Sequence, residues 1–278
     1  MMEPALRTIA VHLPAASLCS RLLEMAIPLA QRSDATLVGV HVVPAVVVYA
    51  DATVSMSTEF IVAQQEAFKD DAEAIRRAFR HGVEPSGVAF EWSNADTGDE
   101  PTMRAASTFC NIADLVIASQ YHDRIPAAAG YSPDDLVLGT GRPVLIVPVS
   151  GELRPLGRRV LVAWNGSREA ARASFDALPL LAPEAEMRLV AVDSPRGDVT
   201  LNAMTRALSR HGVHAVPISI SRSGGRSVSE EILRHAAEFS ADMLVLGCYG
   251  HSRLRETVFG GATTRILRDM TLPVLMAH

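Results

Sequence analysis

The feature that most constrains this chain is an internal repeat, in which two successive halves carry similar motifs in the same order. The apolar run Arg7–Val11 in the first half corresponds to Arg158–Val162 in the second. In the helical pattern that follows each run, Ala26–Leu29 corresponds to Ala177–Leu180 at the same separation along the chain. The repeat therefore predicts a tandem of two similar units.

The ends of the two halves match as their beginnings do. Ala113–Ala118 resembles Ala241–Leu246, and Arg142–Pro148 resembles Leu272–Met276. The sequence separation between corresponding segments of the two halves is smaller at their ends than at their beginnings. The first half therefore carries extra residues, which we place around Pro44–Glu66.

We expect the boundary between the units within Ser150–Leu156, where Pro, Gly and Ser gather and the apolar periodicity stops. The resulting domains, residues 1–150 and 156–278, are close to the usual size of about 100–200 residues. Apolar residues make up 48% of the chain and charged residues 21%, as in an ordinary globular protein. Each half is long enough to bury a core of its own.

Composition excludes several classes of partner. A formal net charge of −5 and only 5% aromatic residues argue against binding to nucleic acid. No apolar run approaches the about 20 residues that span a bilayer, and no basic segment precedes an apolar core at the N-terminus. Cys19, Cys110 and Cys248 are far apart, without a CxxC motif, so neither a disulfide framework nor a zinc site is expected. We expect a cytoplasmic protein without a metal, nucleic-acid or membrane partner.

Each half predicts strands and helices in alternation, with a strand at both ends. Short apolar runs rich in Val, Ile and Leu are typical of parallel strands that are covered on both faces. The expected strands are Thr8–His12, Thr36–Val43, Gly87–Trp92, Leu115–Ala118, Val144–Val147, Val160–Ala163, Met187–Val192, His214–Ile220, Met243–Leu246 and Val274–Met276. This alternation predicts an α/β fold made of two tandem Rossmann-like open parallel sheets.

Two helices matter for the argument below. We expect helices over Thr58–Arg80 and Ser167–Leu181, with Ser167 as the N-cap of the second. In open parallel sheets, ligands bind beyond the carboxyl ends of the strands, where the strand order reverses. The segments that follow the strands of the second half are therefore the place to look for a site.

A glycine-rich segment follows the fourth strand of the second half. Gly247 and Gly250 come directly after the strand, and Gly260 and Gly261 precede a helix expected to run to Arg268. Glycines let backbone N–H groups approach a ligand closely, and the start of a helix favours an anion. Further polar or positive groups in the segment are His251, Ser252, Arg253, Arg255, Thr263 and Thr264. The segment predicts a phosphate site, although it is not a Walker A loop.

This segment resembles the G-x₂-G-x₉-G-[ST] nucleotide loop of the universal stress proteins. The resemblance covers nearly the whole chain, as a tandem of two adenine nucleotide α hydrolase-like domains, and is strongest over Ala241–Leu275. It implies a stress-response sensor or regulator that binds ATP or a related adenine nucleotide, with or without Mg²⁺. The implied nucleotide-binding residues are Ala163, Asn165, Val192, Gly247, Gly250, His251, Ser252, Gly260, Gly261, Ala262 and Thr263.

Two of these positions depart from the family pattern. Gly261 stands where the family has Ser or Thr. Asn165 stands where the family has an acidic residue that holds the ribose or the adenine, and Asn can form hydrogen bonds but carries no charge. Val192, at the end of the second strand, would line the adenine.

The first half departs further from the pattern. Ser119–Pro126 follows its fourth strand without a G-x₂-G motif, and Gly139 and Gly141 come too late for the loop. Its first strand ends at His12 without an acidic residue after it. We predict that the first half, a degenerate domain, binds no nucleotide through this motif and serves as a structural partner of the second.

Other interpretations stay open at this point. Gly247–Gly261 could be a turn with a tight helix–strand contact, and Asn165–Ser167 a turn with an N-cap. A scaffold without nucleotide would bind a protein or an apolar small molecule at Pro44–Val54. An enzyme has least support, because the sequence shows no catalytic dyad, general base or acidic cluster, and at most slow ATP hydrolysis is expected. The resemblance also suggests that the edges of the final strands, Val144–Val147 and Val274–Met276, pair between domains or between the subunits of a dimer.

Overall fold

The computed structural model describes residues 6–44, 58–96, 101–122, 125, 131–222, 224–248 and 261–278. Contacts within the chain divide it into two compact units. Leu6–Thr140 is the N-terminal unit, and Gly141–His278 is the C-terminal unit. The extra residues of the first half fall largely on 45–57, so the proposed contact segment Pro44–Val54 lies almost entirely outside the described residues.

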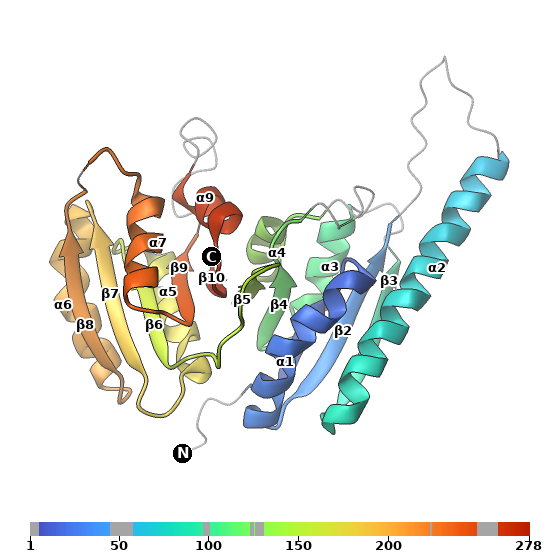
Figure 1. The fold of residues 1–278 in the computed structure, drawn as a ribbon, viewed down its shortest axis with the longest axis horizontal. Helices are drawn as coiled ribbons and strands as arrows, with labels where there is room; N and C mark the ends of the chain where they lie inside the picture. Colours follow the sequence, from blue (N-terminus) through green and yellow to red (C-terminus); the bar gives the residue numbers. More distant parts are fainter. Residues whose placement is uncertain are drawn as a thin grey trace, which may run out of the picture. The chain divides into compact units, whose positions relative to one another are not determined.

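The N-terminal unit is a parallel sheet with helices on both faces. Its strands lie in the order β3-β2-β1-β4, and each described pair within the unit is parallel. Figure 1 shows α1 and α2 on one face of this sheet and α3 and α4 on the other. The elements are β1 (Thr8–His12), α1 (Cys19–Ser33), β2 (Thr36–Val43), α2 (Thr58–Val83), β3 (Phe90–Asp96), α3 (Thr102–Cys110), β4 (Leu115–Ser119) and α4 (Pro133–Thr140).

The C-terminal unit repeats this arrangement and adds a strand. Its strands lie in the order β5-β10-β9-β6-β7-β8, in which β5 alone is antiparallel to its described neighbour, β10. The elements are β5 (Val144–Val147), β6 (Arg159–Ala163), α5 (Arg168–Asp176), β7 (Glu186–Val192), α6 (Pro195–Ser209), β8 (His214–Ile220), α7 (Val228–Glu238), β9 (Met243–Gly247), α9 (Ala262–Asp269) and β10 (Val274–Ala277). The two final strands thus pair with each other, and the order of the remaining strands reverses between β6 and β9.

The structure confirms the α/β fold and most of the expected strands, and it corrects two elements. β3 begins at Phe90 instead of Gly87, because Glu84–Ser86 forms a 3₁₀ turn that Gly87 ends in the left-handed region at a φ of 71°. The helix expected over Ser167–Leu181 ends at Asp176, and a 3₁₀ turn that contains Pro179 follows it. Proline cannot continue an α-helix, since it lacks the N–H group and its ring clashes with the preceding turn.

An aspartate at the same place in each repeat joins the starts of two adjacent strands. Asp114 precedes β4, and its Oδ2 accepts hydrogen bonds from the backbone N–H groups of Arg7 and Thr8, at 2.8 and 3.0 Å. Asp242 precedes β9, and its two oxygens accept three backbone N–H groups from residues 157–159, at 2.7–2.9 Å. Burial raises the pKa of Asp242, and the three donors act against that rise. The aspartate of each Ala-Asp pair therefore holds the start of the fourth strand of its repeat against the start of the first strand.

We expect Asp242→Asn to cost more stability than Asp114→Asn. Asp242 uses both oxygens, so an amide there would turn an NH₂ group toward N–H donors and leave at least one of them unpaired, at about 1–3 kcal/mol. Asp114 uses one oxygen for both donors, and Asn can keep that arrangement. Denaturant unfolding of the two variants checks this, and equal costs would contradict it.

Candidate functional site

The described members of the predicted site lie at one edge of the C-terminal sheet. Ala163, the last residue of β6, lies opposite Val190 of β7 and Leu246 of β9. Because β7, β6 and β9 are parallel, Val192 and Gly247 end their strands at the same edge. Helix α9 carries the chain from β9 back to the parallel strand β10, so it begins at this edge too, while the strand order reverses between β6 and β9.

Part of the predicted site cannot be placed. Gly250, His251, Ser252 and Gly260 lie outside the described residues, as do Arg253 and Arg255. Their roles stay predictions from the sequence.

The start of α9 is suited to an anion. Gly261 is its N-cap, and no described side chain accepts a hydrogen bond from the first turn. Ala262 is exposed, while Thr263 is buried with 6% of its surface exposed. The N–H groups of a first turn and the helix dipole favour negative charge, so this end of the helix matches the predicted phosphate position.

Asn165 forms a tight turn at the end of β6. Its side-chain Oδ1 accepts a hydrogen bond from the backbone N–H of Ser167 at 3.0 Å, and Gly166 between them has a φ of 72°. The Ser167 hydroxyl accepts from the N–H of Ala170 at 3.1 Å, which confirms Ser167 as the N-cap of α5. The interpretation as a turn with an N-cap is thus confirmed, and the contact with ribose stays a prediction.

The start of α6 lies directly against this turn. A Cβ atom on Gly166 would lie 2.6 Å from Cγ of Arg196 and 3.0 Å from its carbonyl oxygen. The indole of Trp164 donates to Oγ1 of Thr200 at 3.0 Å, and this hydroxyl donates to the Arg196 carbonyl at 2.8 Å. Sequence reasoning did not find Arg196 or Trp164, because no motif links β6 to the first turn of α6. A polar residue such as Arg196 in the first turn of a helix is too common to indicate a site.

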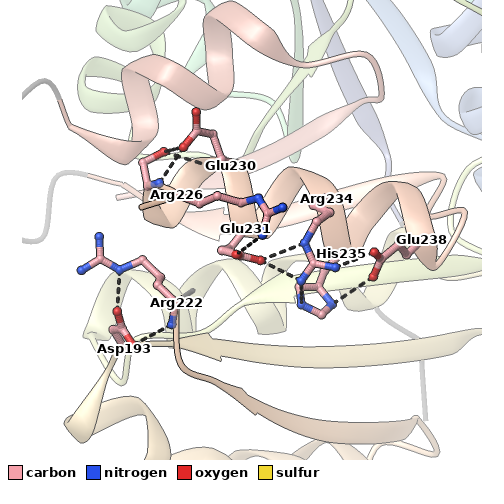
Figure 2. Close-up of polar contacts among 9 residues, drawn as sticks. Asp193, Arg222, Arg226, Glu230, Glu231, Arg234, His235 and Glu238 are labelled. Atoms are coloured by element: carbon pink, nitrogen blue, oxygen red, sulfur yellow. Dashed lines mark hydrogen bonds and ion pairs between the residues drawn. The ribbon is translucent and has the colours of Figure 1, made fainter. Parts of the chain in front are cut away.

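An ion pair links the residue after β7 to a residue that follows β8. Asp193 follows Val192 in the left-handed region at a φ of 42°, and Figure 2 shows its carboxylate turned toward Arg222 at the end of β8. The backbone N–H and the Nε of Arg222 donate to it at 3.1 and 2.5 Å. These hydrogen bonds hold the pKa of Asp193 below its usual range. The carboxylate next to the expected adenine position is therefore already paired.

A second cluster anchors the start of α7. The side chain of Glu231 is 2% exposed and lies between Arg234, at 2.7 Å, and Arg226, at 3.4 Å (Figure 2). The hydrogen bond from Arg234 is the main cause of the lowered pKa of Glu231, and burial opposes it. Ser227 and Glu230 form a capping box one residue earlier. These arginines thus balance a buried carboxylate, which gives them a structural role.

Gly247 is in backbone contact with α5. A Cβ atom at this position would lie 2.2 Å from the N of Ala170 and 2.3 Å from the carbonyl carbon of Glu169. Glu169 is itself buried and forms an ion pair with Arg168. The tight helix–strand contact, one of the two interpretations of the glycine segment, is therefore present at its first glycine.

We expect Gly247→Ala to destabilise the C-terminal unit by about 1–3 kcal/mol, because the new methyl group meets backbone that cannot move without shifting α5. Gly82→Ala is the matched control. Its nearest atom, at 2.5 Å, is the end of the Leu23 side chain, and alanine is favoured in a helix, so its cost should stay below about 1 kcal/mol. Urea unfolding followed by Trp164 fluorescence in a Trp92→Phe background measures the first value, and Trp92 fluorescence in a Trp164→Phe background measures the second. Equal small costs would show that the contact has no energetic weight.

In the N-terminal unit, the chain's own side chains fill the corresponding position. His12, at the end of β1, is 3% exposed and stacks on Tyr131 with ring centroids 5.4 Å apart and an angle of 6°. The Tyr131 hydroxyl donates to the carbonyl of Ser119, the last residue of β4. The ring pair thus bridges β1 and β4, where the strand order of this unit reverses. This filling supports the prediction that the N-terminal unit binds no nucleotide there.

Acid should weaken the N-terminal unit through His12. Burial, with a smaller contribution from His41, lowers the pKa of His12 from 6.5 to about 3. Unfolding therefore takes up a proton between these two pH values. The corresponding stability is complete above pH 6.5 and is lost as the pH falls toward 3.

The substitution His12→Gln removes this proton uptake and isolates its effect. The cost of the substitution should shrink by up to about 1.4 kcal/mol for each pH unit below the unfolded pKa. Urea unfolding of both proteins at about pH 7.5 and about pH 5 measures the change. A cost that does not depend on pH would mean that His12 titrates normally in the folded chain.

Comparisons with known proteins agree with the resemblance seen in the sequence. A family model described as the universal stress protein family matches residues 157–278. A universal stress protein from Synechocystis sp. is 24% identical over 170 residues, which are 58% of this chain. The chain spans 57% of the length of that relative.

Two solved structures share the fold over almost the whole chain. A universal stress protein from Archaeoglobus fulgidus superimposes with a TM-score of 0.69 at 16% identity, over 96% of this chain and 95% of its own. A functionally unknown protein from Pseudomonas aeruginosa PAO1 gives 0.56 at 17% identity, over 98% and 92%. Across the described part of this chain, no helix combines the length and apolar character needed to cross a membrane.

Proposed function

We propose that this chain is a member of the universal stress protein family and a cytoplasmic stress-response sensor or regulator, whose C-terminal unit binds ATP or a related adenine nucleotide. One observation carries the proposal. Asn165, Val192, Gly247 and the start of α9 all lie at the carboxyl edge of the parallel strands, on strands that flank the reversal of strand order or next to them, and ligands of such sheets usually bind at that reversal.

Each group at this edge has a distinct role in the proposal. The start of α9, with the glycine segment before it, holds the phosphates through backbone N–H groups. Val192, which is 7% exposed, lies beside the adenine, and Asn165 lies beside the ribose. Any Mg²⁺ is carried by the phosphates, because Asp193 and Glu169 are already ion-paired. Since neither carboxylate is free to act as a base, we propose slow or no hydrolysis.

A scaffold that binds no nucleotide is the second candidate. The packing contact of Gly247 favours it, because that contact explains the first glycine of the segment without any ligand. Its partner would be a protein or an apolar small molecule at Pro44–Val54.

We also propose self-association, but the structure corrects the expected place, because β10 lies between β9 and β5 and is not an edge strand. β5 already covers one edge of β10, with Val144 opposite Met276 and Ile146 opposite Val274. A second copy could reach that edge of β10 only by replacing β5.

Calorimetric titration with ATP separates the two candidates. We expect about one ATP per chain, with binding abolished in Gly250→Val, where a branched side chain would block the approach of the backbone to phosphate. Ala185→Val is the control, because Ala185 directly precedes β7, lies at the opposite edge of the sheet and has no positive φ that a branched side chain would strain. Absence of heat at millimolar ATP, or equal binding by both variants, would contradict the proposed site and favour the scaffold.

A further inference from the structure

The turn at the end of β6 fixes which way the Asn165 amide faces. The backbone N–H of Ser167 can only donate, so the side-chain atom that it meets at 3.0 Å must be the amide oxygen. The Nδ2 group is therefore the free end. Asn165 is exposed, and Nδ2 has no hydrogen-bond partner among the described residues. The turn therefore occupies the Oδ1 acceptor of Asn165, and the two N–H donors of Nδ2 stay available to a ligand.

An arginine packs against the same turn at Gly166. Cγ of Arg196 packs against Gly166, and the guanidinium is attached two bonds beyond it, through Cδ. Arg196 is exposed and forms no ion pair with any described residue. Its neighbours on this edge differ, because Arg168 is paired with Glu169 and Arg222 with Asp193.

The carboxylate closest to Arg196 in the sequence is also engaged elsewhere. Asp198 lies two positions further along α6, and its Oδ1 accepts a hydrogen bond from the Ser219 hydroxyl of β8 at 2.7 Å. Residues two apart on a helix do not share a face, so Asp198 is not placed to neutralise Arg196. The corner formed by Asn165 and Arg196 therefore offers hydrogen-bond donors and a positive charge that forms no ion pair with a described carboxylate.

We infer that this corner selects an adenine nucleotide that carries a phosphate on its ribose, at the 2′ or the 3′ oxygen, over one with free hydroxyl groups. The inference rests on the proposed function and specifies its ligand. A carboxylate suits a ribose hydroxyl, which donates to it, whereas an arginine suits a ribose phosphate. Phosphate oxygens at this position would accept from Nδ2 of Asn165 and from the Arg196 guanidinium in charge-assisted hydrogen bonds.

The decisive variant is Asn165→Asp. Aspartate keeps the oxygen that accepts from Ser167, so the turn and the fold should survive, which thermal unfolding checks. It replaces the two free donors by an acceptor with negative charge. Arg196→Gln removes the cation, and Arg206→Gln, at an exposed position further along α6, controls for the loss of one positive charge.

Calorimetry would compare AMP with adenosine 2′,5′-bisphosphate and adenosine 3′,5′-bisphosphate. We expect one of the bisphosphates to bind the wild-type chain at least about tenfold more tightly than AMP. Asn165→Asp and Arg196→Gln should each remove most of that preference, while Arg206→Gln should leave it unchanged.

The outcomes separate this inference from the function on which it rests. AMP binding that equals or exceeds that of both bisphosphates, or a preference unchanged in Asn165→Asp, overturns the inference and leaves the nucleotide site standing. A preference that Arg206→Gln reduces as much as Arg196→Gln overturns it as well, because the effect is then one of overall charge. Failure of AMP, ATP and both bisphosphates to bind overturns the proposed function itself.

Discussion

At Gly247 the backbone of β9 touches the backbone of α5, with no room for a side chain between them. This contact sets the distance between the strand and the first turn of the helix, and Ser167 then caps that turn. Asn165 and Gly166 must connect β6 to a helix whose position is already fixed. This connection orients the Asn165 side chain, and Gly166 within it leaves room for Arg196 of α6 to pack against the turn. Gly247, which the sequence assigns to a ligand loop, thus also allows α5 to pack closely against β9.

The two units show how one fold can treat the same position in different ways. Both use an aspartate before the fourth strand to hold the start of the first, through Asp114 and Asp242. At the opposite edge they diverge. The N-terminal unit fills the reversal point with His12 and Tyr131, which are buried and stacked, whereas the C-terminal unit ends its first strand in the exposed amide of Asn165. The two units therefore share a scaffold and differ in the groups at its edge.

The strands and the helix caps were predictable because each depends on nearby residues. Apolar runs located the strands, and Ser167 was recognisable as an N-cap from its place before a helical pattern. The start of β3 was wrong because a 3₁₀ turn after α2 uses Gly87 and delays the strand, which apolar periodicity does not register. The expected site residues that can be placed do converge, since parallel strands bring their carboxyl ends together.

What the sequence did not provide were contacts between residues far apart in the chain. The approach of Arg196 to Gly166 depends on how α6 packs, and the stacking of Tyr131 on His12 joins segments more than a hundred residues apart. The packing role of Gly247 was one of two interpretations that periodicity alone could not separate. Each of these contacts is set by tertiary packing, for which no local pattern exists.

Because β5 pairs with β10, the boundary of the sequence repeat differs from the boundary of the compact structural unit. β5 belongs to the first repeat by sequence, yet its described hydrogen bonds join it to the last strand of the second repeat. A chain cut where the repeats meet would leave β10 with a bare row of N–H and C=O groups, which invites other strands.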